Sequence, residues 1–96
     1  MIRVTARTVL HLATLLGTRE VELELPDESA VEDVLGRLAD LMGEPAVPAL
    51  LSAEDGRPQR HLRIMLNGRD IGFVGGLATA VRDGDEVLVL PPAGGG

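Results

Sequence analysis

The last six residues carry the group with the clearest chemical potential in this sequence. They read Pro91-Pro92-Ala93-Gly94-Gly95-Gly96, so a run of three glycines leads to a terminal carboxylate. Because glycine has no Cβ, such a tail can thread through a narrow cleft and present an unhindered carboxyl group. The alternative is an end that frays in solvent, as the ends of most domains do. Taken alone, the glycines favour fraying, so the elements that precede them must decide.

Other residues with chemical potential are few and isolated. The sequence has no Cys, and all nine basic residues are Arg, so it offers no thiolate, no catalytic lysine and no side chain that could accept an isopeptide bond. His11 has no second ligand candidate nearby, and we interpret it as structural. The glutamates at 20, 22 and 24 alternate with apolar residues, which is typical of a solvated strand face rather than of a metal site. We therefore expect no metal and no bound cofactor.

Length and charge restrict the class of protein. Ninety-six residues suffice for one domain, and the net charge of −6 disfavours nucleic acid and anionic membranes as direct partners. A protein partner with a basic face is expected instead. No apolar run approaches the roughly 20 residues that a membrane-spanning helix needs, and residues 1–4 do not resemble a signal peptide. These features predict a cytoplasmic location.

The first half of the chain predicts two strands and a helix. Residues 2–8 and 19–25 alternate apolar and polar side chains, which indicates two half-buried strands. Ser29 and Glu32 have the spacing of a capping box, and Gly43 is a typical end of a helix. Between them, apolar residues recur at helical spacing and predict one buried stripe: Val31, Val34, Leu35, Leu38, Leu41 and Met42.

The second half predicts a long loop followed by three strands. Residues 44–60 indicate a loop, with at most a short helical turn near Leu50. A strand over 61–66 then meets Asn67-Gly68, a pair typical of a tight hairpin turn, and a short strand returns over 69–73. The Gly75-Gly76 pair permits a reversal, with two core anchors beyond it, Leu77 and Val81.

The last strand leads directly to the glycine tail. Asp83-Gly84-Asp85 indicates a turn, and the apolar run at 86–90 is typical of a central strand buried on both faces. Pro91 and Pro92 end the sheet, because proline cannot donate to a strand ladder. We predict an α+β fold, a mixed sheet with one main helix packed on one face and the last strand parallel to the first. This is a ubiquitin-like β-grasp domain over residues 1–92, with a flexible tail over 93–96.

The motifs of the last third resemble one family. Residues 66–71, Leu-Asn-Gly-Arg-Asp-Ile, are followed by Gly75-Gly76-Leu77, by residues 83–87, Asp-Gly-Asp-Glu-Val, and by Pro91-Pro92 with the terminal glycines. In this order they are similar to the small subunit of molybdopterin synthase, the MoaD family of sulfur carriers. The order of elements and the helix extend the resemblance over nearly the whole chain.

The resemblance implies a mechanism in which this chain is a co-substrate rather than a catalyst. An E1-like enzyme would use ATP to adenylate the Gly96 carboxylate, and a sulfurtransferase would supply the sulfur of a thiocarboxylate. The tail, through Gly94 and Gly95, would then enter the large subunit of the synthase, where the sulfur attacks a pterin precursor. The chain would thus be the sulfur-donating, non-catalytic subunit of a molybdopterin synthase complex in the biosynthesis of the molybdenum (or tungsten) cofactor.

The resemblance also leaves alternatives open. Leu90, Pro91 and Pro92 would direct the tail and contact the partner. Phe73 is a further candidate for partner contact, although a single Phe in a small domain is more often a core residue. The same fold serves sulfur carriers for thiamine, tRNA thiolation or cysteine synthesis, although thiamine carriers typically lack a loop such as 44–60. A ubiquitin-like modifier would join Gly96 to lysines of other proteins. A plain interaction module with a frayed end is the remaining possibility.

Overall fold

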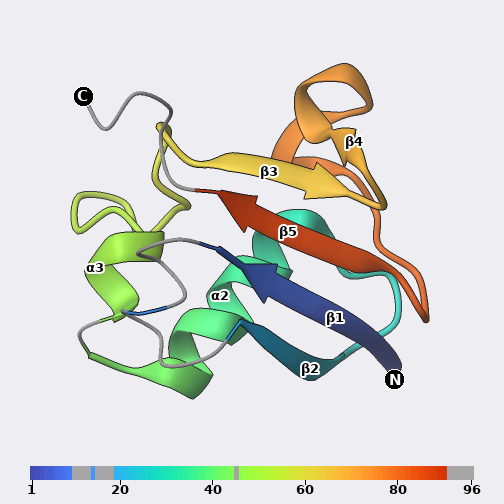
Figure 1. The fold of residues 1–96 in the computed structure, drawn as a ribbon, viewed down its shortest axis with the longest axis horizontal. Helices are drawn as coiled ribbons and strands as arrows, with labels where there is room; N and C mark the ends of the chain where they lie inside the picture. The colour runs from blue at the N-terminus through green and yellow to red at the C-terminus, as the bar shows by residue number, and fades with distance from the viewer. Residues whose placement is uncertain (10–13, 15–18, 45, 91–96) are drawn as a thin grey trace.

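A computed structural model describes residues 1–9, 14, 19–44 and 46–90, and places a sheet against one main helix (Figure 1). The strands are β1 (Ile2–Thr8), β2 (Glu20–Leu25), β3 (Arg63–Leu66), β4 (Arg69–Asp70) and β5 (Glu86–Leu90). The helices are α2 (Val31–Met42), α3 (Ala46–Leu50) and two short 3-10 turns, η1 (Ile71–Phe73) and η2 (Gly76–Ala78). None of the described helices is long and apolar enough to cross a membrane. The α+β fold predicted from the sequence is confirmed.

The last strand lies at the centre of the sheet. The strand order is β2-β1-β5-β3-β4, and β5 runs parallel to β1 and antiparallel to β3. Since β1 and β2 form an antiparallel pair, the chain makes a hairpin, a helical crossover and a second hairpin before β5 fills the gap. The predicted central and parallel placement of the last strand is confirmed.

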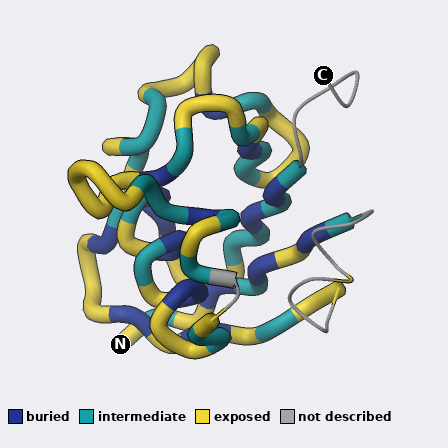
Figure 2. Tube along the Cα trace, turned by 90° about the vertical axis from the view of Figure 1, so that its left-hand side faces the viewer, coloured by how far each residue is buried: buried dark blue, intermediate teal, exposed yellow. Residues whose placement is uncertain are grey.

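The core lies between the sheet and α2. Alternate strand residues point toward the helix, and Figure 2 shows buried positions alternating with more exposed ones. Most of the fully buried aliphatic side chains come from α2 and from the strands, among them Val4, Val31, Val34, Leu35, Val87 and Val89. Val81 is also buried and Leu77 packs against the core, as the sequence predicted.

The start and one position of the helix differ from the prediction. Ala30 is the N-cap, because its backbone stays extended and pairs with Ala80. The hydroxyl of Ser29 donates to the carbonyl of Pro26 at 2.7 Å, and the carboxylate of Asp33, rather than that of Glu32, accepts from the Ala30 N–H at 2.8 Å. The predicted Ser29–Glu32 capping box is therefore wrong by one residue.

Leu41 does not belong to the buried stripe of α2. Its exposed fraction is 48%, whereas Ala39 is buried in the core. The helix turns 100° per residue, so the stripe drifts toward Ala39 and leaves Leu41 at the side of the helix. Gly43 ends the helix as predicted, with a positive φ of 67° and its N–H bonded to the carbonyl of Ala39.

The segment over 44–60 contains more structure than the expected loop. Helix α3 packs against α2, and Leu50 is completely buried in the core. Leu51 pairs with Pro58 in an isolated bridge, and the side-chain amide of Gln59 donates to the carbonyl of Pro48 at 3.0 Å. The prolines of this segment suggested a loop. Burial of Leu50 in the core nevertheless stabilises the short helix α3.

Two turns clamp β5 into the sheet. Asn67 has a positive φ of 50°, as the predicted Asn-Gly turn requires, and its side-chain carbonyl accepts from the Glu86 N–H at 2.8 Å. Its side-chain N–H donates to Asp85 at 3.0 Å, while Asp85 also accepts from the Arg82 N–H at 2.7 Å. On the other side of β5, Asp83 accepts from the N–H of Arg3 in β1 at 2.8 Å. The Asn-Gly and Asp-Gly-Asp motifs therefore fix β5 between its two neighbours.

We predict that Asn67 contributes to stability through these side-chain bonds and through its tolerance of positive φ. Asn67→Gly removes only the bonds and should lower the free energy of unfolding by about 1–2 kcal/mol in urea titrations. Asn67→Ala keeps a Cβ at positive φ but removes the polar side chain that lets asparagine tolerate this conformation, and it should lower the free energy of unfolding by about 1–2 kcal/mol more. If Asn67→Gly has the same urea midpoint of unfolding as the unmodified protein, the side-chain bonds of Asn67 to Asp85 and Glu86 do not stabilise the position of β5.

Candidate functional site: the end of the central strand and its open face

The glycine tail continues from the end of β5. Val89 pairs with Thr8 of β1, and Leu90 pairs with Arg63 of β3, so β5 has a strand on each side up to Val89, and Leu90 remains paired with β3. The predicted site residues Pro91, Pro92, Gly94, Gly95 and Gly96 lie outside the described residues. Their attachment point is nevertheless defined: Leu90 ends a strand whose inner residues, Val87 and Val89, are fully buried.

The sheet face turned away from α2 carries an apolar patch beside this attachment point. Leu88 is paired with Met65, and both are half-buried, as is Leu90. Directly paired residues lie on the same face of a sheet, so these three side chains, which we call the apolar face, lie together opposite the helix. The prediction that 86–90 is buried on both faces is therefore wrong, because no described element covers the side of Leu88 and Leu90.

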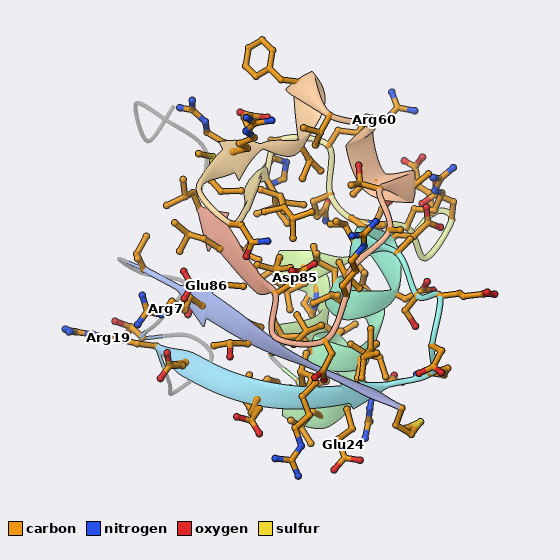
Figure 3. All side chains as sticks on the ribbon, turned by 90° about the vertical axis from the view of Figure 1, so that its right-hand side faces the viewer. Arg7, Arg19, Glu24, Arg60, Asp85 and Glu86 are labelled. Carbon is orange, nitrogen blue, oxygen red and sulfur yellow. The ribbon has the colours of Figure 1, made fainter. Side chains whose placement is uncertain are left out.

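Ion pairs border the apolar face. The guanidinium of Arg7 lies 2.9 Å from Glu20 and 3.5 Å from Glu86, and it connects β2 to β5 across β1 (Figure 3). The hydrogen bond to Glu20 and the charge of Glu86 raise the pKa of Arg7. On the β3 side, Arg63 lies 3.1 Å from Asp70. The apolar face thus has charged groups on two sides, as partner interfaces have polar rims.

Phe73, the only aromatic residue, projects from the edge of the same sheet. It ends η1, and its exposed fraction of 89% is the largest among the exposed large apolar residues described. The sequence predicted a strand over 69–73, but only Arg69 and Asp70 pair with β3 before the chain turns. The ring is therefore accessible to a partner, and the partner contact expected for Phe73 remains a prediction.

Asp70 holds the turn that carries Phe73. One carboxylate oxygen accepts from the Gly72 N–H at 2.9 Å, and the other accepts from Arg63 at 3.1 Å. A Cβ on Gly72 would lie 3.2 Å from the first oxygen, which leaves little room for a side chain. The hydrogen bond from Gly72 lowers the pKa of Asp70 more than the bond from Arg63 does, whereas desolvation opposes the shift.

Gly75 completes the turn for a steric reason. A Cβ at Gly75 would lie 2.8 Å from the hydroxyl oxygen of Thr79, which itself donates to the carbonyl of Gly76 at 2.7 Å. Gly76 has a positive φ of 67°. The predicted Gly75-Gly76 reversal is confirmed, and it returns the chain from Phe73 to the core at Leu77.

The described part of the site offers apolar and charged surfaces. Within residues 1–9, 14, 19–44 and 46–90, no three His, Asp or Glu side chains are grouped to hold a metal ion. Sequence analysis found Phe73 and Leu90 but missed Met65 and Leu88. The signal for both was present, because apolar residues at alternate positions of two paired strands remain on the open face when only one helix is available.

We predict that the Phe73 turn loosens in acid. The folded-state pKa of Asp70 is lowered, so the ionised carboxylate stabilises the turn. This contribution is complete above the ordinary aspartate pKa of 3.8 and is lost as the pH falls through the lower, folded-state pKa. An NMR titration should show the Asp70 carboxyl titrating below 3.8, with the Gly72 amide shift following it. In Asp70→Asn the Gly72 amide should not respond to pH. An Asp70 midpoint at or above 3.8 would contradict this interpretation.

Comparison with known proteins identifies the family. Residues 10–96 match the profile of the ThiS family. Small archaeal modifier protein 3 of Haloferax volcanii is 36% identical over 81 residues, which cover 84% of this chain and 85% of that protein.

Two solved structures share the fold closely. The solution structure of small archaeal modifier protein 1 from Methanosarcina acetivorans superposes with a TM-score of 0.85 at 30% identity, covering 100% of this chain and 98% of that one. A crystal structure of the BexX/CysO complex of Amycolatopsis orientalis contains a chain with a TM-score of 0.70 at 26% identity, covering 97% of this chain and 99% of that chain. With the central β5 that leads to a glycine tail, these matches show that the chain belongs to the ThiS/MoaD family of ubiquitin-like sulfur carriers.

Proposed function

We propose that this chain carries sulfur as a thiocarboxylate on Gly96 and donates it as the small subunit of molybdopterin synthase. The observation that carries the proposal is the placement of β5, which fixes the start of a glycine-rich end at the centre of the sheet within a chain of the sulfur-carrier family. The tail would enter the active site of a partner, while the domain would stay outside and be recognised through its surface.

The chemistry needs a carboxylate at the end of a slender tail and little else from this chain. In the proposed first step, an oxygen of the Gly96 carboxylate attacks the α-phosphorus of ATP in an E1-like enzyme, and pyrophosphate leaves. A persulfide of a sulfurtransferase then displaces AMP, and reductive cleavage of the resulting acyl disulfide by a thiol leaves the thiocarboxylate. The adenylate is required because a carboxylate is a poor electrophile, and the thiocarboxylate sulfur is a nucleophile at neutral pH.

The apolar face and Phe73 would recognise the partners. Met65, Leu88 and Leu90 lie beside the start of the tail, so a partner that accepts the tail must also come close to them. Burying half-exposed Leu side chains and an exposed Phe stabilises a complex without any cost to the core. Their bordering ion pairs, Arg7–Glu86 and Arg63–Asp70, would fix the orientation.

The motifs around Asn67-Gly68 and Asp83-Gly84-Asp85 support the large subunit of molybdopterin synthase as the recipient of the sulfur. A second candidate is conjugation of Gly96 to lysines of other proteins, favoured by 36% identity to a protein named as a modifier. Delivery of sulfur to cysteine synthesis or to another pathway uses the same thiocarboxylate. Sulfur donation and conjugation differ in the nucleophile. In sulfur donation the thiocarboxylate sulfur of Gly96 attacks the acceptor, whereas in conjugation a lysine amine of another protein attacks the activated Gly96.

Mass spectrometry of the protein isolated from its own cells tests the proposal. We expect a fraction of the chain in which sulfur replaces one oxygen of the Gly96 carboxylate. We also expect that deletion of Gly96 abolishes ATP–pyrophosphate exchange by the activating enzyme while the circular dichroism and Tm stay unchanged.

Each other outcome has a defined meaning. A branched peptide that joins Gly96 to a lysine of another protein would support the modifier candidate. Unchanged pyrophosphate exchange after deletion of Gly96 would overturn both candidates. Formation of molybdopterin in a reaction with the large subunit and a pterin precursor distinguishes the proposed recipient from other pathways, and its absence would contradict the assignment.

A separate prediction concerns Phe73. Because its side chain is 89% exposed, Phe73→Ala should leave Tm unchanged but raise the Kd for the activating enzyme. If the ring is buried in the complex, we expect an increase of roughly tenfold or more, measured by titration calorimetry. Leu41→Ala, which removes an exposed apolar side chain from α2, is the matched control and should leave this Kd unchanged. Equal Kd values for Phe73→Ala and the control would remove Phe73 from the interface.

A further inference from the structure

Strand β2 has one edge that pairs with no other strand among the described residues, and the proposed sulfur chemistry does not use this free edge. It is the terminal strand of the sheet, and its six residues make it longer than β4, the two-residue strand at the opposite edge. The N–H of Thr8 donates to the carbonyl of Arg19 at 2.9 Å, and this register places the main-chain bonds to β1 at Val21, Leu23 and Leu25. Antiparallel pairs alternate, so the main-chain groups of Glu22 and Glu24 point away from β1.

A groove runs along this free edge. It encloses about 490 Å³ between β2 and α2. Its lining residues are Met1, Glu22, Leu23, Glu24, Pro26, Arg37 and Leu41, and we call this region the edge groove. Leu41, the residue that departs from the buried stripe of α2, contributes an apolar wall with 48% of its surface exposed. Main-chain donors and acceptors therefore adjoin an apolar surface, which is the arrangement that an added strand uses.

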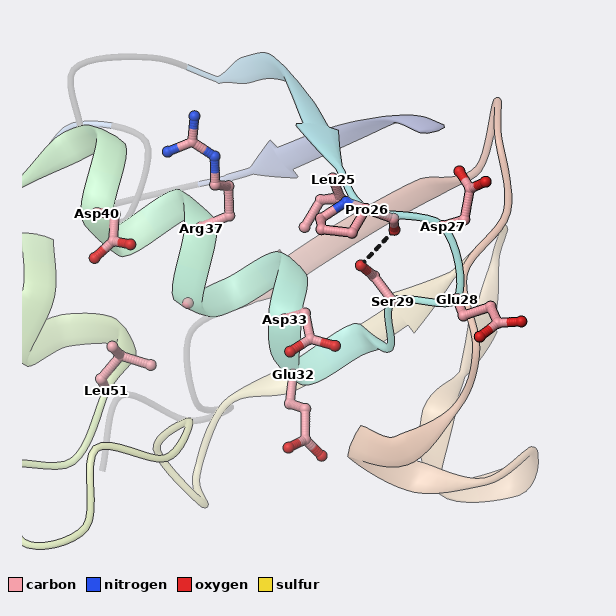
Figure 4. A pocket seen from close by; sticks show the side chains of 11 residues that line it. Leu25, Pro26, Asp27, Glu28, Ser29, Glu32, Asp33, Arg37, Asp40 and Leu51 are labelled. Atoms are coloured by element: carbon pink, nitrogen blue, oxygen red, sulfur yellow. Dashed lines mark hydrogen bonds between the residues drawn. The ribbon is translucent and has the colours of Figure 1, made fainter. Parts of the chain in front are cut away.

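The surroundings of the edge groove are strongly acidic. A second hollow of about 600 Å³ shares Pro26 and Arg37 with it and continues along α2 (Figure 4). Carboxylates line both regions: Glu22, Glu24, Asp27, Glu28, Glu32, Asp33 and Asp40. Arg37 is the only guanidinium among the residues that line these two regions. Glu22 pairs with Arg3, Glu32 with Arg57, and Asp27 with the terminal ammonium of Met1, but the carboxylates still outnumber the cationic groups.

The glutamates of β2 favour a basic strand over a second copy of this chain as the binding partner of the free edge. If two copies of this chain joined their β2 edges, the glutamates of one strand would lie opposite those of the other, and like charges in cross-strand positions are destabilising. The net charge of −6 adds to that repulsion. A basic strand meets the opposite situation, because its Lys or Arg side chains would lie next to Glu22 and Glu24.

We propose that the free edge of β2 and the edge groove bind an extended basic segment of a partner protein as a sixth strand of the sheet. Main-chain bonds would form at Glu22 and Glu24. Because strand side chains alternate between faces, basic residues of the segment would lie beside the glutamates on the open face, and the apolar residues between them would contact Leu41. Strand β1 lies between this edge and β5, so the edge is separate from the start of the tail. Phe73 follows β4, at the opposite edge of the sheet.

A synthetic peptide tests the proposal on the full chain. The probe is acetyl-Lys-Val-Arg-Val-Lys-Val-Arg-amide, added to ¹⁵N- and ¹³C-methyl-labelled protein. We expect shift changes at the amides of Glu22 and Glu24 and at the methyl groups of Leu41. A peptide N-methylated at alternate residues, whose main chain cannot pair, should not bind, and neither should the sequence with Glu in place of each basic residue.

Variants measure the two parts of the interaction. Leu41→Ala should weaken binding roughly fivefold or more through lost apolar contact, whereas Val74→Ala, with 43% exposure at the other side of the sheet, should not change it. Glu24→Gln should weaken binding about two- to fivefold, which is the range of a cross-strand charge pair. Circular dichroism confirms that each variant is folded, and pyrophosphate exchange should be unchanged in Leu41→Ala.

Several results would overturn the proposal. One is the absence of shift changes at Glu22, Glu24 and Leu41, and another is a set of changes centred on Met65 and Leu88. Equal binding of the N-methylated peptide would show that charge alone attracts the probe. A dimer in sedimentation experiments without peptide, with shifts at Glu22 and Glu24 that depend on protein concentration, would assign the edge to a second copy instead.

Discussion

The insertion of β5 between β1 and β3 is the constraint on which the rest of the structure depends. Without it the two hairpins have no common sheet, and the tail has no fixed starting point. The clamp consists of local polar contacts, because Asn67 bonds to both Asp85 and Glu86 while Asp83 accepts from the N–H of Arg3. These contacts help to fix the register of a short chain with a small core. Burial of Val87 and Val89 excludes a slip by one residue, which would turn both side chains to the open face, but it does not exclude a slip by two residues.

One main helix covers only one side of the sheet. The other side carries ion pairs in one half and apolar side chains in the other. Toward β2 the open face carries ion pairs, such as Arg3–Glu22 and Arg7–Glu20. Toward β3 it carries Met65, Leu88 and Leu90. The apolar half therefore coincides with the end of β5, where a partner that accepts the tail must approach. An isolated chain tolerates this patch because it is small and its charged neighbours keep it hydrated at the rim.

The sequence was most informative where local chemistry determines conformation. Asn67-Gly68 requires positive φ, and the periodicity of α2 requires a buried stripe, so both were predicted correctly except at Leu41, which lies outside the stripe. Errors arose where tertiary contacts override local preference. Ala80 holds Ala30 extended and delays the helix, and the core recruits Leu50 into a helical turn. The early end of β4 has a local cause that the prediction missed, because Asp70 accepts a hydrogen bond from the N–H of Gly72 two residues further on. The position of the tail itself was predicted only through the strand that precedes it, and residues 91–96 lie outside the described structure.

The glutamates of β2 illustrate how one pattern can satisfy several requirements. Their alternation with Val21, Leu23 and Leu25 specifies the strand, and their pairing with Arg3 and Arg7 aligns it with β1. The same charges oppose pairing between the edges of two copies, which matters because an exposed six-residue edge is otherwise a template for aggregation. A carrier that must pass from one partner to another needs a surface that binds its partners but not a second copy of itself. Repulsion between copies keeps the edge available, and only a strand of opposite charge can occupy it at low electrostatic cost.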